Sequence, residues 1–430
     1  MTSQQAVVSR PGDDDRPLPA GRHCHVLIVV ENNSVPYDDR RVWMESVALV
    51  QAGMDVSVIC PAMEGQKLRE RLEGVEVFRF AAPADSGTAA GFVRSYAVSW
   101  LRVARLTMRV WRQQPFQVLQ ACNPPDTYFL LALLLKPLGV TFLFDQHDLC
   151  PEVYIDRFGR PSRLMLTVLR LLERLTHLVA HEVITVNESC RTLLLGRTST
   201  KPSHLSVVRT GADLDRLHDV GVEEPLRRGA RYLCCYLGEM APQDGVEMVL
   251  RTAHELVVRR GRRDIGFALL GYGELLDDLR QLSAELGLAD AVTFTGRADD
   301  AVISAYLSTA DIALQPDVKT SFNDCCSMLK TIEYMAFGLP VVAFDLTETR
   351  RSVGEAGTYV ISETPEAYAD AVEALLDDEE GRAEMSRIGR ARSRGELAWE
   401  PQKKTYVEVV SSLCARASRK AALTTGACHD

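Results

Sequence analysis

Residues 321–344, SFNDCCSMLKTIEYMAFGLPVVAF, decide the fold because a helix and a buried strand follow each other directly there. Apolar residues recur at helical spacing from about Ser327, and Gly338 and Pro340 end the helix. The apolar run at 341–344 then predicts a fully buried strand. A helix followed at once by a buried strand is typical of a parallel α/β sheet.

The same alternation of helical patterns and short apolar runs extends in both directions along the chain. In the first half, short apolar runs predict strands at His25–Val30, Asp55–Cys60, Val75–Phe80, Gln117–Gln120, Thr141–Asp145 and Glu182–Val186. In the second half, strands are predicted at RYLCCYLG, GFALLG, VTFTG, DIALQP, LPVVAF and TYVI. We therefore expect an α/β protein with two doubly wound, Rossmann-like domains, in which ligands bind beyond the carboxyl ends of the strands.

The pattern also predicts where the domains begin and end. The expected division is a disordered arm at 1–21, an N-terminal domain at 22–215, a polar linker at 216–229, a second domain at 230–395, a helix at 396–420 and a loose tail at 421–430. We expect the helix at 396–420 to pack back toward the N-terminal domain.

Several function classes are excluded by composition and by missing motifs. The net charge of −9 argues against nucleic acid as a partner. The turn after the first strand, ENNSVPYDDRR at 31–41, has no glycine, so it cannot be a dinucleotide fingerprint, and the chain has no P-loop. The apolar stretch 129–144 is interrupted by Lys136, Pro137 and Gly139, which indicates a buried helix and strand rather than a membrane span.

The cysteines suggest neither a disulfide framework nor a zinc site. There are 11 of them, with no CxxC pair and no cluster with histidine. Reduced thiols in a cytoplasmic protein are the simplest interpretation.

Glycines stand where strands of the second half end. Gly238 follows one predicted strand, Gly271 and Gly273 follow the next, and Gly296 precedes Arg297 after a third. Glycine permits close approach of a ligand to the backbone, and the N–H groups at a helix start suit a phosphate. These turns favour a phosphate-containing ligand, although each alone is common in α/β proteins.

The order of these motifs resembles that of the retaining GT-B glycosyltransferases of family 4. In the second half the resemblance rests on QDGV at 243–246, GYGE at 271–274, FTGR at 294–297 and EYMAFGLPVV at 333–342. In the first half it rests on SVPYDDRR at 34–41, FDQHDLCPE at 144–152 and VNES at 186–189. The similarity extends over about residues 24–395 and implies two domains that face a cleft.

The resemblance implies a donor site for a nucleotide-diphosphate sugar in the second domain. Glu333 is expected to hold the ribose hydroxyls, since a carboxylate accepts two hydrogen bonds from a vicinal diol. Backbone N–H groups at Cys326, Ser327 and Met328 are expected to face the diphosphate. Lys330 is expected to stabilise the leaving group. The remaining donor-site candidates are Gly238, Gly271, Gly273, Arg209 and Arg297.

Two departures from the family pattern concern the same site. Cys325 occupies the position of a glutamate that usually contacts the donor sugar, and Glu239 and Asp244 occupy positions where an arginine and a lysine usually contact the diphosphate. An ordinary surface ion pair between Lys330 and Glu333 remains an alternative to the donor site.

The acceptor side is expected in the first domain. The resemblance implies that His147 lies near the transferring sugar as a catalytic residue; a histidine that merely bonds Asp148 is the alternative. Ser34, Asp39, Arg41 and Asp148 are candidates for acceptor binding, together with Cys325 for the sugar. Asp39 and the adjacent arginines could instead form ion pairs with one another.

The sequence thus predicts a retaining transfer from a UDP- or GDP-linked sugar to a small-molecule or lipid-linked acceptor, without metal or cofactor. A nucleotide-sugar epimerase and a catalytically silent nucleotide-sugar-binding protein remain alternatives. Arg102, Arg105, Arg109 and Arg112 lie on one face of a predicted helix at 92–112. This face either contacts the inner membrane surface peripherally or is simply solvated. The oligomeric state is left open.

Overall fold

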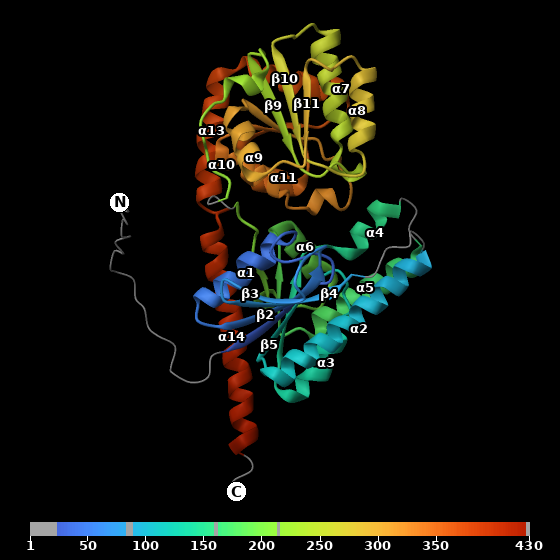
Figure 1. The fold of residues 1–430 in the computed structure, drawn as a ribbon, viewed down its shortest axis with the longest axis vertical. Helices are drawn as coiled ribbons and strands as arrows, with labels where there is room; N and C mark the ends of the chain where they lie inside the picture. Colours follow the sequence, from blue (N-terminus) through green and yellow to red (C-terminus); the bar gives the residue numbers. More distant parts are fainter. Residues whose placement is uncertain (1–23, 83–88, 159–161, 213–215, 427–430) are drawn as a thin grey trace, which may run out of the picture.

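The computed structural model describes residues 24–82, 89–158, 162–212 and 216–426. Figure 1 shows two α/β units, one above the other, each built on a sheet with helices on both faces. The expected α/β class with two Rossmann-like domains is confirmed. The arm predicted at 1–21 lies outside the described residues.

Each unit contains one largely parallel sheet. The N-terminal sheet has the order β3 (Arg69–Leu72), β4 (Val75–Ala81), β2 (Asp55–Ala62), β1 (His25–Val29), β5 (Val118–Cys122), β6 (Thr141–Gln146), β7 (Glu182–Thr185) and β8 (Leu205–Val207). The C-terminal sheet has the order β11 (Val292–Gly296), β10 (Ile265–Leu270), β9 (Tyr232–Leu237), β12 (Ile312–Gln315), β13 (Val341–Phe344) and β14 (Gly357–Val360). Only β3 among these described strands pairs in antiparallel fashion.

All strands predicted from apolar runs are present. The sequence pattern missed β3 and β8 because neither has an apolar run: β3 reads RERL at the edge of the sheet, and β8 has 3 residues. The helix expected to begin near Ser327 begins at Leu329, with Met328 as its N-cap residue.

Helices cover both faces of each sheet. In the N-terminal unit, α1 (Arg40–Gln51) packs on one face, and α2 (Ala89–Gln113), α3 (Phe129–Leu135), α5 (Arg163–Val179) and α6 (Glu188–Arg197) pack on the other, with α4 (Cys150–Phe158) beside α5. In the C-terminal unit, α7 (Val246–Ala253), α8 (Leu276–Glu285) and α12 (Pro365–Asp377) cover one face, and α9 (Asp300–Thr309), α10 (Leu329–Phe337) and α13 (Glu379–Arg394) cover the other, with α11 (Thr347–Val353) beside α10. Within the described ranges, no helix has the length and apolar content needed to cross a bilayer.

The last helix, α14 (Trp399–Gly426), returns to the N-terminal sheet. Its Tyr406, Val410 and Leu413 are buried in the same cluster as residues of β1 and β2. The Tyr406 hydroxyl donates to Gln120 Oε1 at 2.6 Å. Part of the segment expected as a loose tail is therefore helical.

A disulfide joins Cys24, just before β1, to Cys414 of α14. The expectation that all thiols are reduced is therefore wrong. The two cysteines are 390 residues apart, so sequence spacing could not reveal the pair.

Candidate functional site

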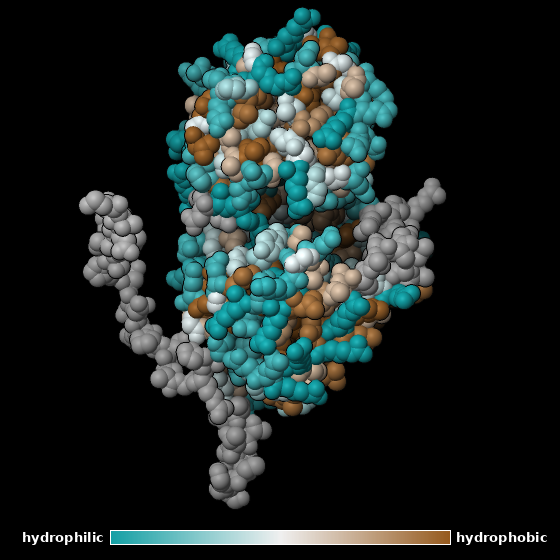
Figure 2. Space-filling view, viewed as in Figure 1, coloured by the Kyte–Doolittle hydropathy of each residue, from teal (hydrophilic) through white to brown (hydrophobic). Residues whose placement is uncertain are grey.

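A pocket of about 380 Å³ lies between the two domains, where Figure 2 shows a hollow in the surface. The N-terminal domain contributes the residues that follow β1 and β6, and the C-terminal domain contributes the short helix η6 (Asn323–Cys325) and the start of α10. The lining includes Asn33, Asp38, Asp39, Arg40, Arg41, His147, Asp148, Cys190, Cys325, Cys326, Ser327 and Ile332. The structure thus brings together residues at 33–41, 147–148 and 325–327 that are far apart in sequence.

His147 is held as a cation at the N-terminal side of this pocket. Its Nε2 donates to Asp145 Oδ2 at 2.8 Å, and its Nδ1 is 4.0 Å from Asp39 Oδ2. Burial lowers the pKa of His147, but the charge and hydrogen bond of Asp145 together with the charge of Asp39 outweigh burial and raise it to about 9. The imidazole is therefore protonated at neutral pH, and it bonds Asp145 rather than Asp148.

Arg41, which also lines the pocket, binds the same carboxylate. Its Nη2 donates to Asp145 Oδ1 at 2.8 Å, and the guanidinium is also 3.2 Å from Glu45 Oε1. Burial raises the pKa of Glu45, whereas Arg41 and His147 hold the pKa of Asp145 below its usual range despite burial. Arg41 thus fixes the carboxylate that orients His147, and because it also lines the pocket, its role in acceptor binding stays a prediction.

The other acceptor-side candidates divide between the pocket and its support. Asp39 lines the pocket and also caps α1, since its Oδ1 accepts from Val42 N–H at 3.0 Å. Asp148 lines the pocket, and burial raises its pKa. Ser34 is buried, and its hydroxyl donates to Gln66 Oε1, so it supports the loop rather than facing the pocket.

The start of α10 forms the opposite wall. The N–H groups of Ser327 and Met328 have no acceptor among the residues that the structure describes, whereas the Cys326 N–H donates to the Asn323 carbonyl at 3.2 Å. Unsatisfied N–H groups at a helix start are a site for an anion. Ser327 and Met328 therefore fit the expected diphosphate role better than Cys326 does.

Glu333 lies one turn further along α10 and is 7% exposed. Its Oε1 accepts from Arg216 Nη2 at 2.8 Å, and Arg216 also bonds Asp300 of α9. Arg216 lies in the stretch predicted as a linker, and no sequence motif indicated its contact with Glu333. Lys330 and Glu333 have different partners, so they do not form the surface pair considered as an alternative.

Lys330 lies between Asp317, just after β12, and Asp244 of the short helix η4 (Pro242–Asp244), which follows β9. Its Nζ is 3.2 Å from Asp317 Oδ1 and 3.5 Å from Asp244 Oδ1, and it lies over the Tyr236 ring. Burial lowers the pKa of Lys330, but the two carboxylates outweigh burial and raise it. The ammonium thus lies beside position 244, where the family pattern has its own lysine.

Two glycines of the predicted donor loops are required by contacts between the loops. A Cβ on Gly271, where φ is +147°, would come within 1.7 Å of the Gly238 carbonyl oxygen. A Cβ on Gly273 would come within 2.4 Å of the Met240 carbonyl oxygen. The close approach of backbone to backbone therefore explains these glycines without a ligand.

The two arginines proposed as helpers lie elsewhere. Arg209 donates to Glu348 Oε1 at 2.7 Å, and the Arg297 guanidinium stacks on the Tyr272 ring at 4.5 Å. Neither residue is part of the pocket lining. Met328, Lys330 and Glu333 are not part of it either, but they lie beside the lining residues Ser327, Leu329 and Ile332.

Cys325 lies at the contact between the domains. Its carbonyl accepts from Asn187 Nδ2 at 2.8 Å, and the same amide nitrogen is 2.8 Å from Ser327 Oγ. The side chain of Cys325 packs against the apolar cluster of the N-terminal domain. Cys325 therefore joins the domains at the point where the family glutamate is missing.

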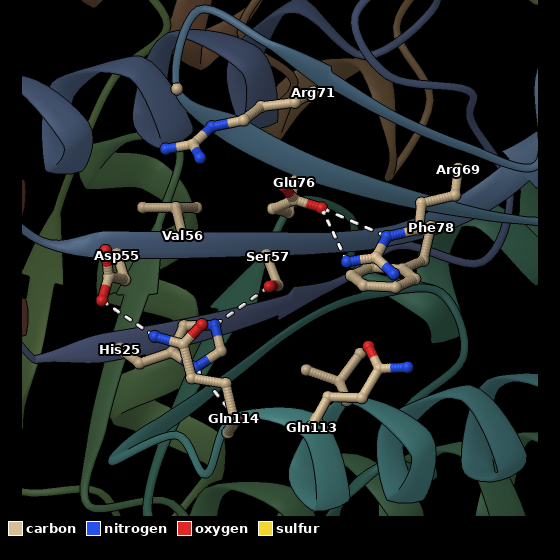
Figure 3. Close-up of a pocket in the computed structure, with 12 residues that line it drawn as sticks. His25, Asp55, Val56, Ser57, Arg69, Arg71, Glu76, Phe78, Gln113 and Gln114 are labelled. Atoms are coloured by element: carbon tan, nitrogen blue, oxygen red, sulfur yellow. Dashed lines mark hydrogen bonds and ion pairs between the residues drawn. The ribbon is translucent and has the colours of Figure 1, made fainter.

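A second pocket, of about 250 Å³, lies where β1, β2 and β4 begin, at the opposite edge of the N-terminal sheet (Figure 3). His25 Nε2 is 2.9 Å from Ser57 Oγ, and Arg69 pairs with Glu76 at 3.2 Å. Several polar groups there bond one another, and the pocket is smaller than the one between the domains, so we assign the ligand site to the latter.

Cys122, Asp145 and His147 have ligand atoms within 4.8 Å of one another. The oxygens of Asp145 are already bonded to Arg41 and His147, so two cations occupy the positions that a metal ion would need. The cluster is therefore an ion-pair network in this structure.

Two family models match the chain. The glycosyl transferase 4-like domain matches residues 39–211, and the glycosyl transferases group 1 model matches residues 231–378.

Curated relatives match over shorter segments. The alpha-D-kanosaminyltransferase of Streptomyces kanamyceticus is 33% identical over 159 residues, which is 36% of this chain and 39% of the relative. The D-inositol 3-phosphate glycosyltransferase 2 of Catenulispora acidiphila is 32% identical over 190 residues, 41% of this chain and 43% of the relative. The match thus spans less than half the length of each relative.

Solved structures share the fold over nearly the whole chain. Sucrose-phosphate synthase from Thermosynechococcus elongatus superposes with a TM-score of 0.70 at 18% identity, covering 91% of this chain and 100% of that one. The Anabaena protein HepE in complex with UDP-glucose gives a TM-score of 0.66 at 14% identity, with 91% and 100% covered. At these identities the likeness concerns the fold alone.

Proposed function

The chain belongs to the GT4-type glycosyltransferases of the GT-B fold, and from this premise we propose that it transfers a sugar from a nucleoside-diphosphate donor to an acceptor in the cleft. One observation carries the proposal: the pocket between the domains has the His147 imidazolium on one wall and the start of α10 on the other. A cation and a helix N-terminus that face one cavity suit a substrate with a diphosphate and a polyhydroxyl group.

On the donor side, α10 supplies the binding groups. The free N–H groups of Ser327 and Met328 receive the diphosphate, and Lys330 adds positive charge as the leaving group departs. Glu333, oriented by Arg216, accepts the ribose hydroxyls. HepE, a fold neighbour, was solved with UDP-glucose, which supports a UDP-linked sugar as the first donor to assay.

On the acceptor side, His147 positions oxygens and does not remove a proton. As a cation at neutral pH it can only donate hydrogen bonds. We propose that the leaving phosphate takes the acceptor proton on the same face of the sugar, so that the anomeric configuration is retained without a metal or a cofactor. The name of the inositol 3-phosphate glycosyltransferase supports a polyhydroxylated acceptor, and we propose either a small molecule or a lipid-linked one.

The test is release of UDP or GDP from a panel of nucleotide sugars, with and without acceptor pools. Transfer predicts release that depends on the acceptor, an epimerase predicts a changed sugar without acceptor, and a silent binder predicts neither.

Glu333→Gln provides the residue-level test of the same site. Loss of charge-assisted bonds to the ribose should weaken UDP binding, measured by calorimetry, by about tenfold. Asp300→Asn changes the other partner of Arg216 and serves as the matched control. Equal UDP affinity in wild type and Glu333→Gln would reject the ribose role.

A further inference from the structure

An apolar stripe follows the exposed side of α5. Leu164, Val168, Leu171 and Leu178 recur at helical spacing, and Leu164 and Leu178 are 75% and 70% exposed. Arginines stand immediately beside this stripe, at Arg163, Arg170 and Arg174. An exposed helix face with aliphatic side chains bordered by arginine is typical of helices that lie at a lipid–water interface.

The neighbouring α3 and the short helix η1 (Lys136–Leu138) extend the same surface. Leu130, Leu133, Leu134 and Leu138 are exposed there, and α3 contacts α5. We call the exposed residues of α3, η1 and α5 the α3–α5 face. More than half of the large apolar side chains exposed among the described residues lie on this face or on α2. In Figure 2, hydrophobic residues gather over the part of the molecule where Figure 1 places these helices.

The charges on these helices have one sign. The sequences of α2, α3, η1 and α5 contain a single carboxylate, Glu173, which is buried and bonded to Arg197. The exposed charged residues are Arg94, Arg105, Arg109, Arg112, Lys136, Arg163, Arg170 and Arg174. The whole chain, by contrast, has a net charge of −9. Lys136, Arg163, Arg170 and Arg174 belong to η1 and α5 themselves, so the helices of the α3–α5 face carry exposed cations and no exposed carboxylate.

We propose that the α3–α5 face docks the protein on an anionic lipid membrane. Aliphatic side chains of this face enter the headgroup region, and the surrounding arginines and Lys136 pair with lipid phosphates. A second copy of the chain is the less suitable occupant, because an interface between two identical faces places these cations against one another.

The membrane contact proposed here lies on other helices than the one expected from the sequence. The sequence pattern pointed to Arg102, Arg105, Arg109 and Arg112 of α2, but Arg102 bonds the Ala81 carbonyl. The apolar contact comes instead from α3 and α5. Helix α4 packs against α5 and begins directly after the pocket residues Asp148 and Leu149, so docking brings the cleft close to the membrane surface.

The experiment is co-sedimentation of the full chain with sucrose-loaded vesicles of phosphatidylcholine, with or without phosphatidylglycerol. We expect binding to the vesicles that contain phosphatidylglycerol, and weaker binding at high salt. The double variants Leu164→Ser/Leu171→Ser and Arg163→Glu/Arg170→Glu should each lower the partition coefficient about tenfold. Ile361→Ser and Arg263→Glu, in the C-terminal domain, are the matched controls and should bind like wild type.

Two results would overturn the proposal: no sedimentation of the wild type with anionic vesicles, or double variants that sediment as the wild type does. Sedimentation velocity without lipid tests the alternative that a second copy of the chain covers this face. A wild-type dimer that dissociates in Leu164→Ser/Leu171→Ser would assign the face to that second copy. UDP binding by the same preparations shows that the variants are folded, and it does not depend on membrane docking.

Discussion

At the residue scale, the position of Lys330 decides how the site receives an anion. Its ammonium faces the carboxylates of Asp317 and Asp244, so the three side chains together have a net negative charge when all are ionised. That charge opposes a diphosphate. Burial raises the pKa of Asp244 to about 6, so this carboxyl can take up a proton at mildly acidic pH. When Asp244 is protonated, Lys330 has one charged carboxylate partner, Asp317, and the three side chains no longer have a net negative charge that repels a diphosphate.

We expect nucleotide-sugar binding to be coupled to proton uptake by Asp244. Because a bound diphosphate raises the pKa of Asp244 further, affinity should be high below about pH 6 and fall by about tenfold toward pH 8. Calorimetry with UDP-glucose measures this slope, since its diphosphate gains no proton in that range. Asp244→Asn should bind more tightly than wild type at pH 8 and lose the slope. Asp277→Asn, in the exposed first turn of α8, is the control, and an unchanged slope in Asp244→Asn contradicts the coupling.

At the scale of elements, both apolar packing and a disulfide hold α14 against the N-terminal sheet. Tyr406, Val410 and Leu413 bury it against the N-terminal sheet, and the Cys24–Cys414 disulfide fixes it to the start of β1. A bond that closes a loop of 390 residues restricts the unfolded chain strongly.

Reduction of this disulfide should lower the free energy of unfolding by about 2–4 kcal/mol. Denaturant unfolding with and without reductant measures the change. The double variant Cys24→Ser/Cys414→Ser should resemble the reduced wild type and should not respond to reductant. If the wild type unfolds identically in both conditions, the bond contributes nothing to stability.

The elements also show what the sequence could predict. Strands such as β9 and β13 are apolar over their whole length, so the local sequence pattern was sufficient to predict them. Arg216 and Asn187 could not be found in this way, because their partners lie 117 and 138 residues along the chain. The bond between Arg41 and Asp145 and the Cys24–Cys414 disulfide likewise join residues far apart in the sequence, so local spacing could not predict them.

At the scale of the whole molecule, polar contacts join the two domains beside the pocket. Glu348 of α11 is fully buried, and it accepts hydrogen bonds from Ser189 of α6 and from Arg209. Asn187 donates to the Cys325 carbonyl and bonds Ser327. Since Cys325 and Ser327 flank the start of α10, these contacts set the distance between His147 and the donor groups. Closure of two domains around a substrate assembles a catalytic site and excludes water.

Asn187→Asp tests whether the contacts of Asn187 with Cys325 and Ser327 hold the domains together, and it should leave α6 intact. Asn187 Oδ1 accepts from Cys190 N–H at 2.7 Å and caps α6, and aspartate caps a helix equally well. The substitution replaces the donating amide by an oxygen that repels the Cys325 carbonyl, so the domains should separate more readily. Losing such bonds corresponds to about tenfold lower turnover, and small-angle scattering should give a larger radius of gyration.

Asp299→Asn, which caps α9 away from the domain contact, is the matched control for Asn187→Asp. Unchanged turnover and radius in Asn187→Asp would mean that the Asn187 contacts do not hold the domains together. The remaining contacts, such as those of Glu348 with Ser189 and Arg209, would then have to do so. Lower turnover with an unchanged radius would instead place the effect at Ser327 itself, because the domains would remain closed while the N–H groups at the start of α10 lost their orientation.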